Sequence, residues 1–321
     1  MMSTTEITAA GAQPAATAPA SAAELAARIQ IPRRLPPRYD GQPLQHLSHS
    51  SVGRFSICAE DWRRYYIAGE RSAPTGSMFL GRRVDDTISL YYQRILDHCE
   101  RLDLEQLKDA YRDRWRADEE TERERLGIAW EEDLRPEGAF QLGLDAIELS
   151  VAQLIPHLGE PVAVQRRMEY TLAPSLEWSV LGYIDLETLR PDNGALVPTV
   201  VDYKVKTTPL TQYKADHDFQ PAVYLAGRWL ESDPAAQFSF AQIAKPGARR
   251  KAMGASIVTT TRSAGQLRGA LARIAQAARQ IVACYERFGP DEPWGFADPS
   301  GWKCSPRYCE HWHSCPGGAG L

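Results

Sequence analysis

The clearest pattern of apolar and polar residues lies in the middle of the chain, at residues 181–204. Two runs rich in apolar, β-branched and aromatic residues flank a cluster of turn formers at 190–194. This arrangement predicts two β-strands joined as a hairpin. Because side chains alternate along a strand, Asp202 and Lys204 should emerge on one face, with Asp185 on the first strand. The hairpin can therefore bring two carboxylates and an ammonium group together.

Repeats of apolar residues every three or four positions predict helices on both sides of this hairpin. We expect helices at residues 84–96, 104–130, 140–158, 219–230 and 263–288, and further strands at 161–172, 238–244 and 256–261. An earlier helix, capped by Ser50 or Ser51, should carry Cys58 and the aromatic residues Phe55, Trp62, Tyr65 and Tyr66. This mixture predicts an α/β fold with one central mixed β-sheet flanked by helices.

The first 44 residues are rich in alanine and proline, and large apolar residues are scarce among them. Such a segment buries too little surface to offset its ordering entropy, so we expect a disordered tail at 1–44. We expect one domain at 45–316, with a helical insertion at about 100–158. The N-terminus lacks the basic and hydrophobic regions of a secretory signal, and no apolar run is long enough to span a bilayer. These features predict a cytoplasmic protein without a membrane partner.

The 321-residue chain has a net charge of −4, which by itself argues against a nucleic-acid partner. The charge is uneven, however, because residues 118–137 hold nine acids and three bases, a local charge of −6. The rest of the chain therefore carries about +2. Basic groups occur at Arg82 and Arg83, at Lys245 with 249–251, and between Arg262 and Arg279. They could follow a phosphate backbone or be solvated surface charge.

The acids of the hairpin lie beside apolar residues such as Val200 and Val201, where charge is costly unless it is paired or metal-bound. Mg²⁺ prefers carboxylate oxygens and completes its shell with water and substrate phosphate. Asp185 and Asp202 are therefore candidate metal ligands, and Lys204 could orient a nucleophilic water or offset developing charge. An isolated Asp-x-Lys pattern is more often an ordinary ion pair.

The sequence around these residues resembles the PD-(D/E)XK nuclease superfamily in its RecB-like branch. The resemblance lies in Gly-x-x-Asp on one strand, Val-Val-Asp-Tyr-Lys on the next, and Gln-x-x-x-Tyr opening a helix. It implies a restriction-endonuclease-like core in which two acids bind metal, the lysine is catalytic, and the residue between acid and lysine offers its backbone carbonyl. The site residues so implied are Asp185, Asp202, Tyr203, Lys204, Gln220 and Tyr224.

The same family has a helix with Gly-x-x-x-His, whose histidine is a metal ligand, and residues 81–85 match it with Asp85 in the histidine position. Aspartate can also bind Mg²⁺ or Mn²⁺, so the departure affects metal preference. Asp86 is the alternative if the register differs by one residue. Glu169 matches a position that is often acidic, and it is either a support for the metal site or solvated.

Three of the six cysteines, Cys304, Cys309 and Cys315, lie in the last 18 residues. Clustered thiols in a reducing compartment suit a metal or an iron–sulfur cluster. From the residues alone, the fourth ligand is either His311 or His313, giving a zinc knuckle, or a distant cysteine. AddB-type and CRISPR-associated relatives hold a 4Fe-4S cluster with one upstream and three C-terminal cysteines. The resemblance therefore implies that Cys58 is the upstream cluster ligand, and that the cluster fixes a cluster-binding tail at about 289–316. Cys99 and Cys284 should be small buried apolar residues on helices.

The resemblance implies a Mg²⁺- or Mn²⁺-dependent DNA exonuclease that acts on single-stranded or free ends. The pathway would be recombination, repair, phage replication or CRISPR adaptation. The chain has no Gly-x-x-x-x-Gly-Lys-Ser/Thr motif, so any ATP-driven unwinding would need a helicase or recombination partner. The alternatives are a catalytically silent nuclease-fold protein that binds DNA or assembles with partners, which the aspartate at position 85 favours, and an RNA-directed nuclease.

Overall fold

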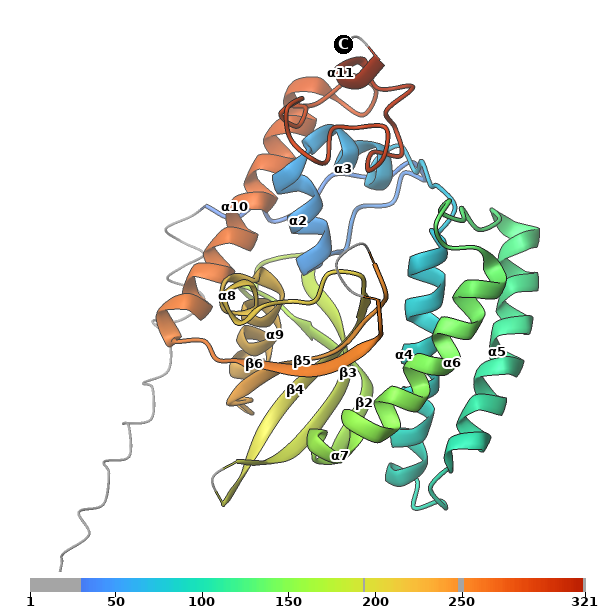
Figure 1. The fold of residues 1–321 in the computed structure, drawn as a ribbon. Helices are drawn as coiled ribbons and strands as arrows, with labels where there is room; N and C mark the ends of the chain where they lie inside the picture. The colour runs from blue at the N-terminus through green and yellow to red at the C-terminus, as the bar shows by residue number, and fades with distance from the viewer. Residues whose placement is uncertain (1–29, 193, 248–250, 320–321) are drawn as a thin grey trace, which may run out of the picture.

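A computed structural model describes residues 30–192, 194–247 and 251–319 of the chain. It has one six-stranded sheet between two groups of helices (Figure 1). The strands are β1 (His46–Leu47), β2 (Glu160–Tyr170), β3 (Ser179–Asp192), β4 (Ala195–Lys206), β5 (Gln237–Ala244) and β6 (Gly254–Thr260). The helices are α2 (His49–Ile57), α3 (Ala59–Tyr66), α4 (Gly76–Leu96), α5 (Leu104–Arg125), α6 (Pro136–Gln153), α7 (Ile155–Leu158), α8 (Gln212–His217), α9 (Phe219–Leu230), α10 (Ala264–Phe288) and α11 (Pro316–Ala319).

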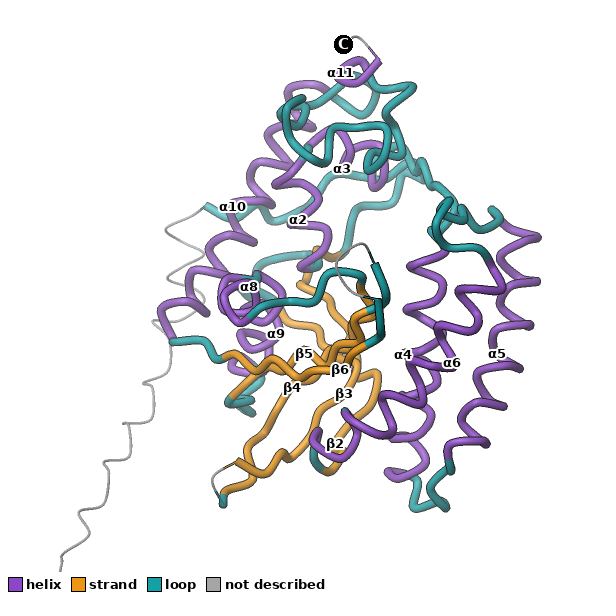
Figure 2. Tube along the Cα trace, in the orientation of Figure 1, coloured by secondary structure: helices purple, strands orange, loops and turns teal. Residues whose placement is uncertain are grey.

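The sheet is mixed, as the sequence predicts. β1 pairs with β3 and β4 with β5 in parallel, whereas β2–β3, β3–β4 and β5–β6 are antiparallel. Helices cover both faces of β4 and β5, so both faces of these strands are apolar. Successive side chains point to opposite faces, and Val200 and Val201 therefore lie in different cores. One core contains α2, α9 and α10, and the other contains α4, α5 and α6, as the arrangement in Figure 2 makes visible.

The sheet splits at the centre of the predicted hairpin. β3 and β4 are paired from the turn up to Leu186 and Val201. Beyond this point β4 continues beside β5, while the same edge of β3 meets β1 at Ser179 and Val180. β2 occupies the other edge of β3 from Val180 to Leu189. The split opens directly next to Asp185 and Asp202.

Several predicted boundaries change. α4 begins at Gly76, where the Thr75 side chain caps it, so Asp85 lies in mid-helix and not near the start. The helix expected through residues 55–66 is two helices, because Cys58 adopts an extended conformation between α2 and α3. Its cap is Ser48, which forms a reciprocal capping box with Ser51, and not Ser50 or Ser51 itself.

The ordered chain also extends upstream of the predicted domain start. Residues 1–29 of the expected tail lie outside the described residues. Within 30–44, Leu35 and Leu44 are buried in the α9–α10 core, and the Trp178 indole donates a hydrogen bond to the carbonyl of Pro32. These few apolar side chains are enough to fix the segment against the sheet.

Candidate active site and cysteine cavity

The acids of the hairpin meet at the split in the sheet. The backbone N–H of Tyr203 donates a hydrogen bond of 2.9 Å to Oδ2 of Asp185, so the carboxylate bridges the strands where their ladder has ended. Asp202 is buried, and its Oδ2 forms an ion pair with Lys204 two residues further along β4. The predicted grouping of Asp185, Asp202 and Lys204 is therefore present in the fold.

Helix α9 fixes the orientation of these groups from one side. Gln220 and Tyr224 are four residues apart and share a face of the helix. The Gln220 side-chain amide donates a 2.5 Å hydrogen bond to Oδ1 of Asp202, and the Tyr224 hydroxyl donates a 3.0 Å bond to the carbonyl of Tyr183 on β3. Both residues touch the protein's own acids or backbone, so their geometry is that of positioning residues.

Helix α4 brings Asp85 to the same site from the other side of the sheet. One oxygen, Oδ2, accepts a hydrogen bond of 3.2 Å from Gln165, while Oδ1 is buried without a hydrogen-bond partner among the described residues. Burial, and then the nearby carboxylates of Asp86 and Asp202, raise the pKa of Asp85 to about 7. Asp86 itself is ion-paired with Arg83 on its own helix at 2.8 Å. The contacts therefore associate Asp85, more than Asp86, with the acid site.

The site holds more negative charge than its one ammonium group can balance. Burial, and then the charges of Asp202 and Asp85, raise the pKa of Asp185 well above its usual range. Burial opposes the charge on Lys204, but the carboxylate of Asp202 outweighs this and raises the pKa of Lys204. Three carboxylates and one ammonium, with a buried oxygen that has no donor, offer oxygen ligands to a divalent cation, although the three carboxylates do not all have ligand atoms within 4.8 Å of one another.

Two neighbours of the acids carried no clear sequence signal. Gln165 has a positive φ of 47°, an irregularity of β2 that directs its amide to Asp85 and to Ser89. His49 lies against the Tyr224 ring at 5.6 Å, and burial lowers the pKa of His49. Glu169, the acid considered for this place, is exposed and contacts Ser179 and Arg167 instead.

Cysteines from the two ends of the described chain surround one small cavity. Cys58, Cys304, Cys309 and Cys315 all line a space of about 20 Å³, together with Asp61 and Lys303. None of the four is in a disulfide, and burial raises the pKa of Cys58 and of Cys309. Four thiols around one cavity are a donor set suited to an iron–sulfur cluster.

The remaining two cysteines lie elsewhere. Cys284 packs partly buried against the α9–α10 core, as expected, but Cys99 is exposed after the end of α4. The reason is that α4 ends at Leu96, so Cys99 is in the following loop and not on a helical face.

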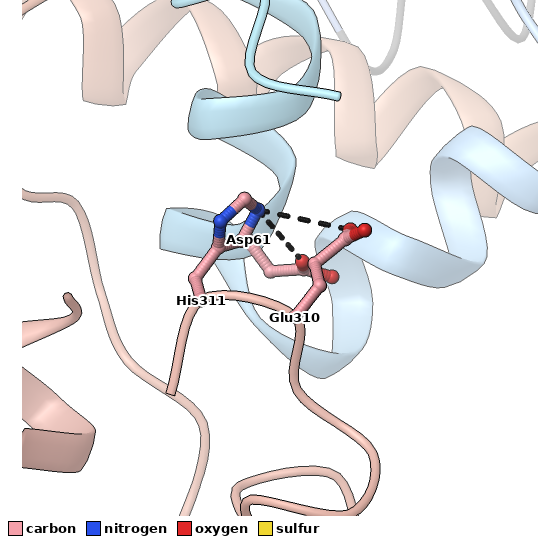
Figure 3. A group of neighbouring side chains, drawn as sticks. All are labelled: Asp61, Glu310 and His311. Carbon is pink, nitrogen blue, oxygen red and sulfur yellow. Dashed lines mark ion pairs between the residues drawn. The ribbon is translucent and has the colours of Figure 1, made fainter. Parts of the chain in front are cut away.

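His311 approaches the carboxylates of Asp61 and Glu310 (Figure 3). It is not among the residues that line the cysteine cavity. Its Nε2 is 3.7 Å from both Asp61 and Glu310, and its Nδ1 is 3.4 Å from Glu70. Asp61, Glu310 and His311 have ligand atoms within 4.8 Å of one another. Arg54 already pairs with both Asp61 and Glu310, at 3.1 and 2.9 Å, so a protein cation balances this group.

The expected phosphate-binding role of the basic groups is not uniform. Lys245 is buried and donates a 2.9 Å hydrogen bond to Ser77, and Arg262 donates to the carbonyls of Ala215 and Asp218. These two cations tie elements of the fold together. The neighbouring residues 249–250 lie outside the described residues.

A mixed sheet with an acid–lysine group at a split between two strands, covered by helices on both faces, is the arrangement expected from the sequence resemblance to a nuclease core. The family model for the PD-(D/E)XK nuclease superfamily matches residues 46–316. The chain therefore belongs to the PD-(D/E)XK nuclease superfamily.

A solved structure agrees with this fold. It is a crystal structure from Eubacterium rectale with the description "Putative exonuclease", and the two chains superpose with a TM-score of 0.50 at 15% sequence identity. The match covers 81% of this chain and 87% of that one. No curated protein matches the sequence. Among the described residues, no helix is long and apolar enough to cross a membrane.

Proposed function

We propose that this protein is a metal-dependent DNA exonuclease of the RecB-like branch, acting in the cytoplasm on single-stranded or free DNA ends. Family membership and the related fold support a nuclease function. The observation that carries the proposal is the group of Asp85, Asp185 and Asp202 with Lys204 at the split in the sheet, where Asp202 is buried and the others are half-buried. Bringing like charges together there lowers the stability of the fold. A catalytic role explains why such a group is present, whereas packing does not.

Each residue has a distinct part in the proposed reaction. Asp85, Asp185 and Asp202 would hold Mg²⁺ or Mn²⁺, with the Tyr203 carbonyl as a further ligand. When bound, the cation supplies Lewis acidity and charge neutralisation at the phosphodiester. Lys204 keeps its proton because of the Asp202 carboxylate, and it can donate hydrogen bonds to a phosphate oxygen or to the attacking water.

The chain's own contacts prepare these groups before substrate arrives. Gln220 prevents rotation of the Asp202 carboxylate, because it donates to the oxygen that Lys204 does not contact. Gln165 does the same for Asp85 and leaves Oδ1 free. The aspartate in place of histidine supports a preference for hard oxygen-binding cations and does not remove the ligand.

We propose in addition that Cys58, Cys304, Cys309 and Cys315 hold a 4Fe-4S cluster, which connects the C-terminal tail to the junction of α2 and α3. The four thiols around one cavity support this assignment. A zinc knuckle through His311 is less well supported, because both ring nitrogens of His311 lie near carboxylates. A helicase or recombination partner would supply any unwinding.

The test is digestion of end-labelled DNA and RNA by anaerobically purified protein with Mg²⁺, with Mn²⁺, and with a chelator. Metal-dependent release of nucleotides from DNA ends is the expected result. Equal cleavage of RNA would make the protein an RNA-directed nuclease. DNA binding without cleavage in either metal would replace the proposal with the catalytically silent assembly protein.

A further inference from the structure

A large groove outside the acid site is lined by basic side chains from three parts of the chain. Its volume is about 500 Å³, and it lies between the α3–α4 connection, the end of α5 and the cysteine-rich tail. Two carboxylates, Glu122 and Glu310, line it together with six cations. These are Arg54, Arg71, Arg82, Arg125, Lys303 and Arg307.

The carboxylates do not neutralise this groove. Glu310 is held by Arg54 and Ser72, and Glu122 is 3.8 Å from Arg125. Arg82 and Arg307 are exposed and have no carboxylate partner among the residues that the structure describes. A chain with a net charge of −4 thus presents an unbalanced positive concavity. An anionic polymer complements it.

The aromatic residues of the groove have different roles. The guanidinium groups of Arg54 and Arg71 lie 4.2 and 3.6 Å from the centroid of the Tyr65 ring, so this ring serves to fix the arginines. Tyr308 is half exposed, has the guanidinium of Arg307 5.4 Å from its ring centroid, and packs edge-on against Trp302, which is 65% exposed. The bases of a duplex already stack on each other, so an exposed ring of this kind suits the free face of an unpaired base.

The groove and the acid site share helix α4, which carries both Arg82 and Asp85. Arg82 lines the groove and precedes Asp85 by three residues on α4, so the two side chains are neighbours on the helix surface. With a rise of about 1.5 Å per residue, their Cα atoms are about 4.5 Å apart along the helix axis. A strand held by Arg82 would therefore continue towards Asp85.

We propose that this groove binds a single nucleic-acid strand, with its phosphates on Arg82, Arg307 and the neighbouring cations and a base on Tyr308, and leads it to the acid site. This inference rests on the proposed nuclease function and names the form of substrate that the site accepts. The cysteine-rich tail would then form one wall of the substrate path.

The test measures binding, in a chelator, of a labelled oligodeoxythymidine of about 16 nucleotides, the upper range for a single-strand site. Arg82→Gln combined with Arg307→Gln should weaken binding about tenfold or more and lower the salt dependence of the affinity. Tyr308→Ala should weaken single-strand binding about tenfold and leave the weaker binding of a duplex of equal length unchanged. The matched control is Arg268→Gln with Arg279→Gln, two exposed cations of α10, which should change binding less than about twofold.

Three results would each overturn the proposed binding groove. They are equal losses of binding in the groove and control variants, unchanged binding in the groove variants, and no binding by the wild type. Thermal melting of every variant identifies a loss that comes from unfolding, and Tyr308→Phe, which keeps the ring, should restore binding. The two proposals can fail separately. If binding depends on the groove but neither metal supports cleavage, the proposed nuclease function is wrong and the proposed binding groove stands. If the groove variants bind and cleave normally, the binding groove is wrong and the nuclease function stands.

Discussion

The acid site and the cysteine cavity use buried polar groups in opposite ways. At the acid site, three carboxylates that repel one another lie around one lysine, and burial, and then this repulsion, raises the pKa of Asp85 and of Asp185. Around the cysteine cavity, Arg54 balances Asp61 and Glu310, and the buried Glu60 pairs with Arg63 and Arg64 at 2.7 and 2.8 Å. The difference indicates that unbalanced charge in the first region costs stability, whereas the charges in the second region are balanced.

The largest effect on cleavage should come from removing charge at the acid site. Asp202→Asn and Lys204→Met should each lower cleavage about a thousandfold or more, because they remove a metal ligand or the group that offsets developing charge. Metal-free Asp185→Asn should melt at the same temperature as the wild type or higher, since carboxylate repulsion is relieved.

Asp113→Asn is the matched control, because Asp113 is an exposed carboxylate of α5 with 82% of its side chain accessible. It should cleave and melt as the wild type does. Near-normal cleavage by Asp202→Asn, in a preparation whose wild type is active, would remove these residues from the site.

Substitutions at the cysteine cavity should lower the melting temperature, in contrast to Asp185→Asn at the acid site. Cys315→Ser should lower the melting temperature by about 5 °C or more, because the tail loses its connection to the α2–α3 junction. Anaerobic protein should be brown, with about four irons per chain, and Cys58→Ser should bleach it as fully as Cys315→Ser. Cys99→Ser should leave colour and melting unchanged, since Cys99 is exposed and distant in sequence from the cavity. One zinc per colourless chain, lost in His311→Ala, would establish the zinc knuckle instead.

Substitution of Gln165 tests whether the hydrogen bonds that orient the carboxylates of the acid site affect metal binding. Gln165→Ala removes the amide that orients Asp85, and outer-shell partners of metal ligands affect affinity or activity by about 10- to 100-fold. We expect a tenfold loss of metal affinity by calorimetry with little change in melting temperature. Gln141→Ala, which removes a similar amide bonded to an aspartate on the exposed face of α6, is the control. A loss in both variants, or in neither, would show that the contact to Asp85 has no special role.

The smallest expected effect is a dependence of stability on pH. The pKa of Asp85 is raised to about 7 in the fold from a usual value near 4, so the folded state binds more protons than the unfolded state between these values. Metal-free protein should therefore lose stability as the pH rises from about 4 to about 7, with a fall in melting temperature of a few degrees. Asp85→Asn should reduce this slope, to which the raised pKa of Asp185 also contributes, and an unchanged slope would mean that Asp85 does not cause it. Added Mg²⁺ should offset the loss at pH 7 and above.

The sequence determined the elements and the chemistry of the central hairpin. Alternation placed Asp202 and Lys204 on one strand face, and the 219–230 periodicity predicted α9 as the structure has it. The mixed sheet followed from the order of strands and helices. These features depend on neighbouring residues, and local periodicity records them directly.

Only the tertiary structure decided how distant segments meet. The split between β3 and β4 depends on pairing with β1 and β5, which no local pattern encodes. The irregular conformation of Gln165, the extended Cys58 between two helices, and the basic groove built from three segments also depend on packing. Where residues separated by many positions form one site, the contacts among already folded elements fix its geometry, because the free energy of packing exceeds local conformational preferences.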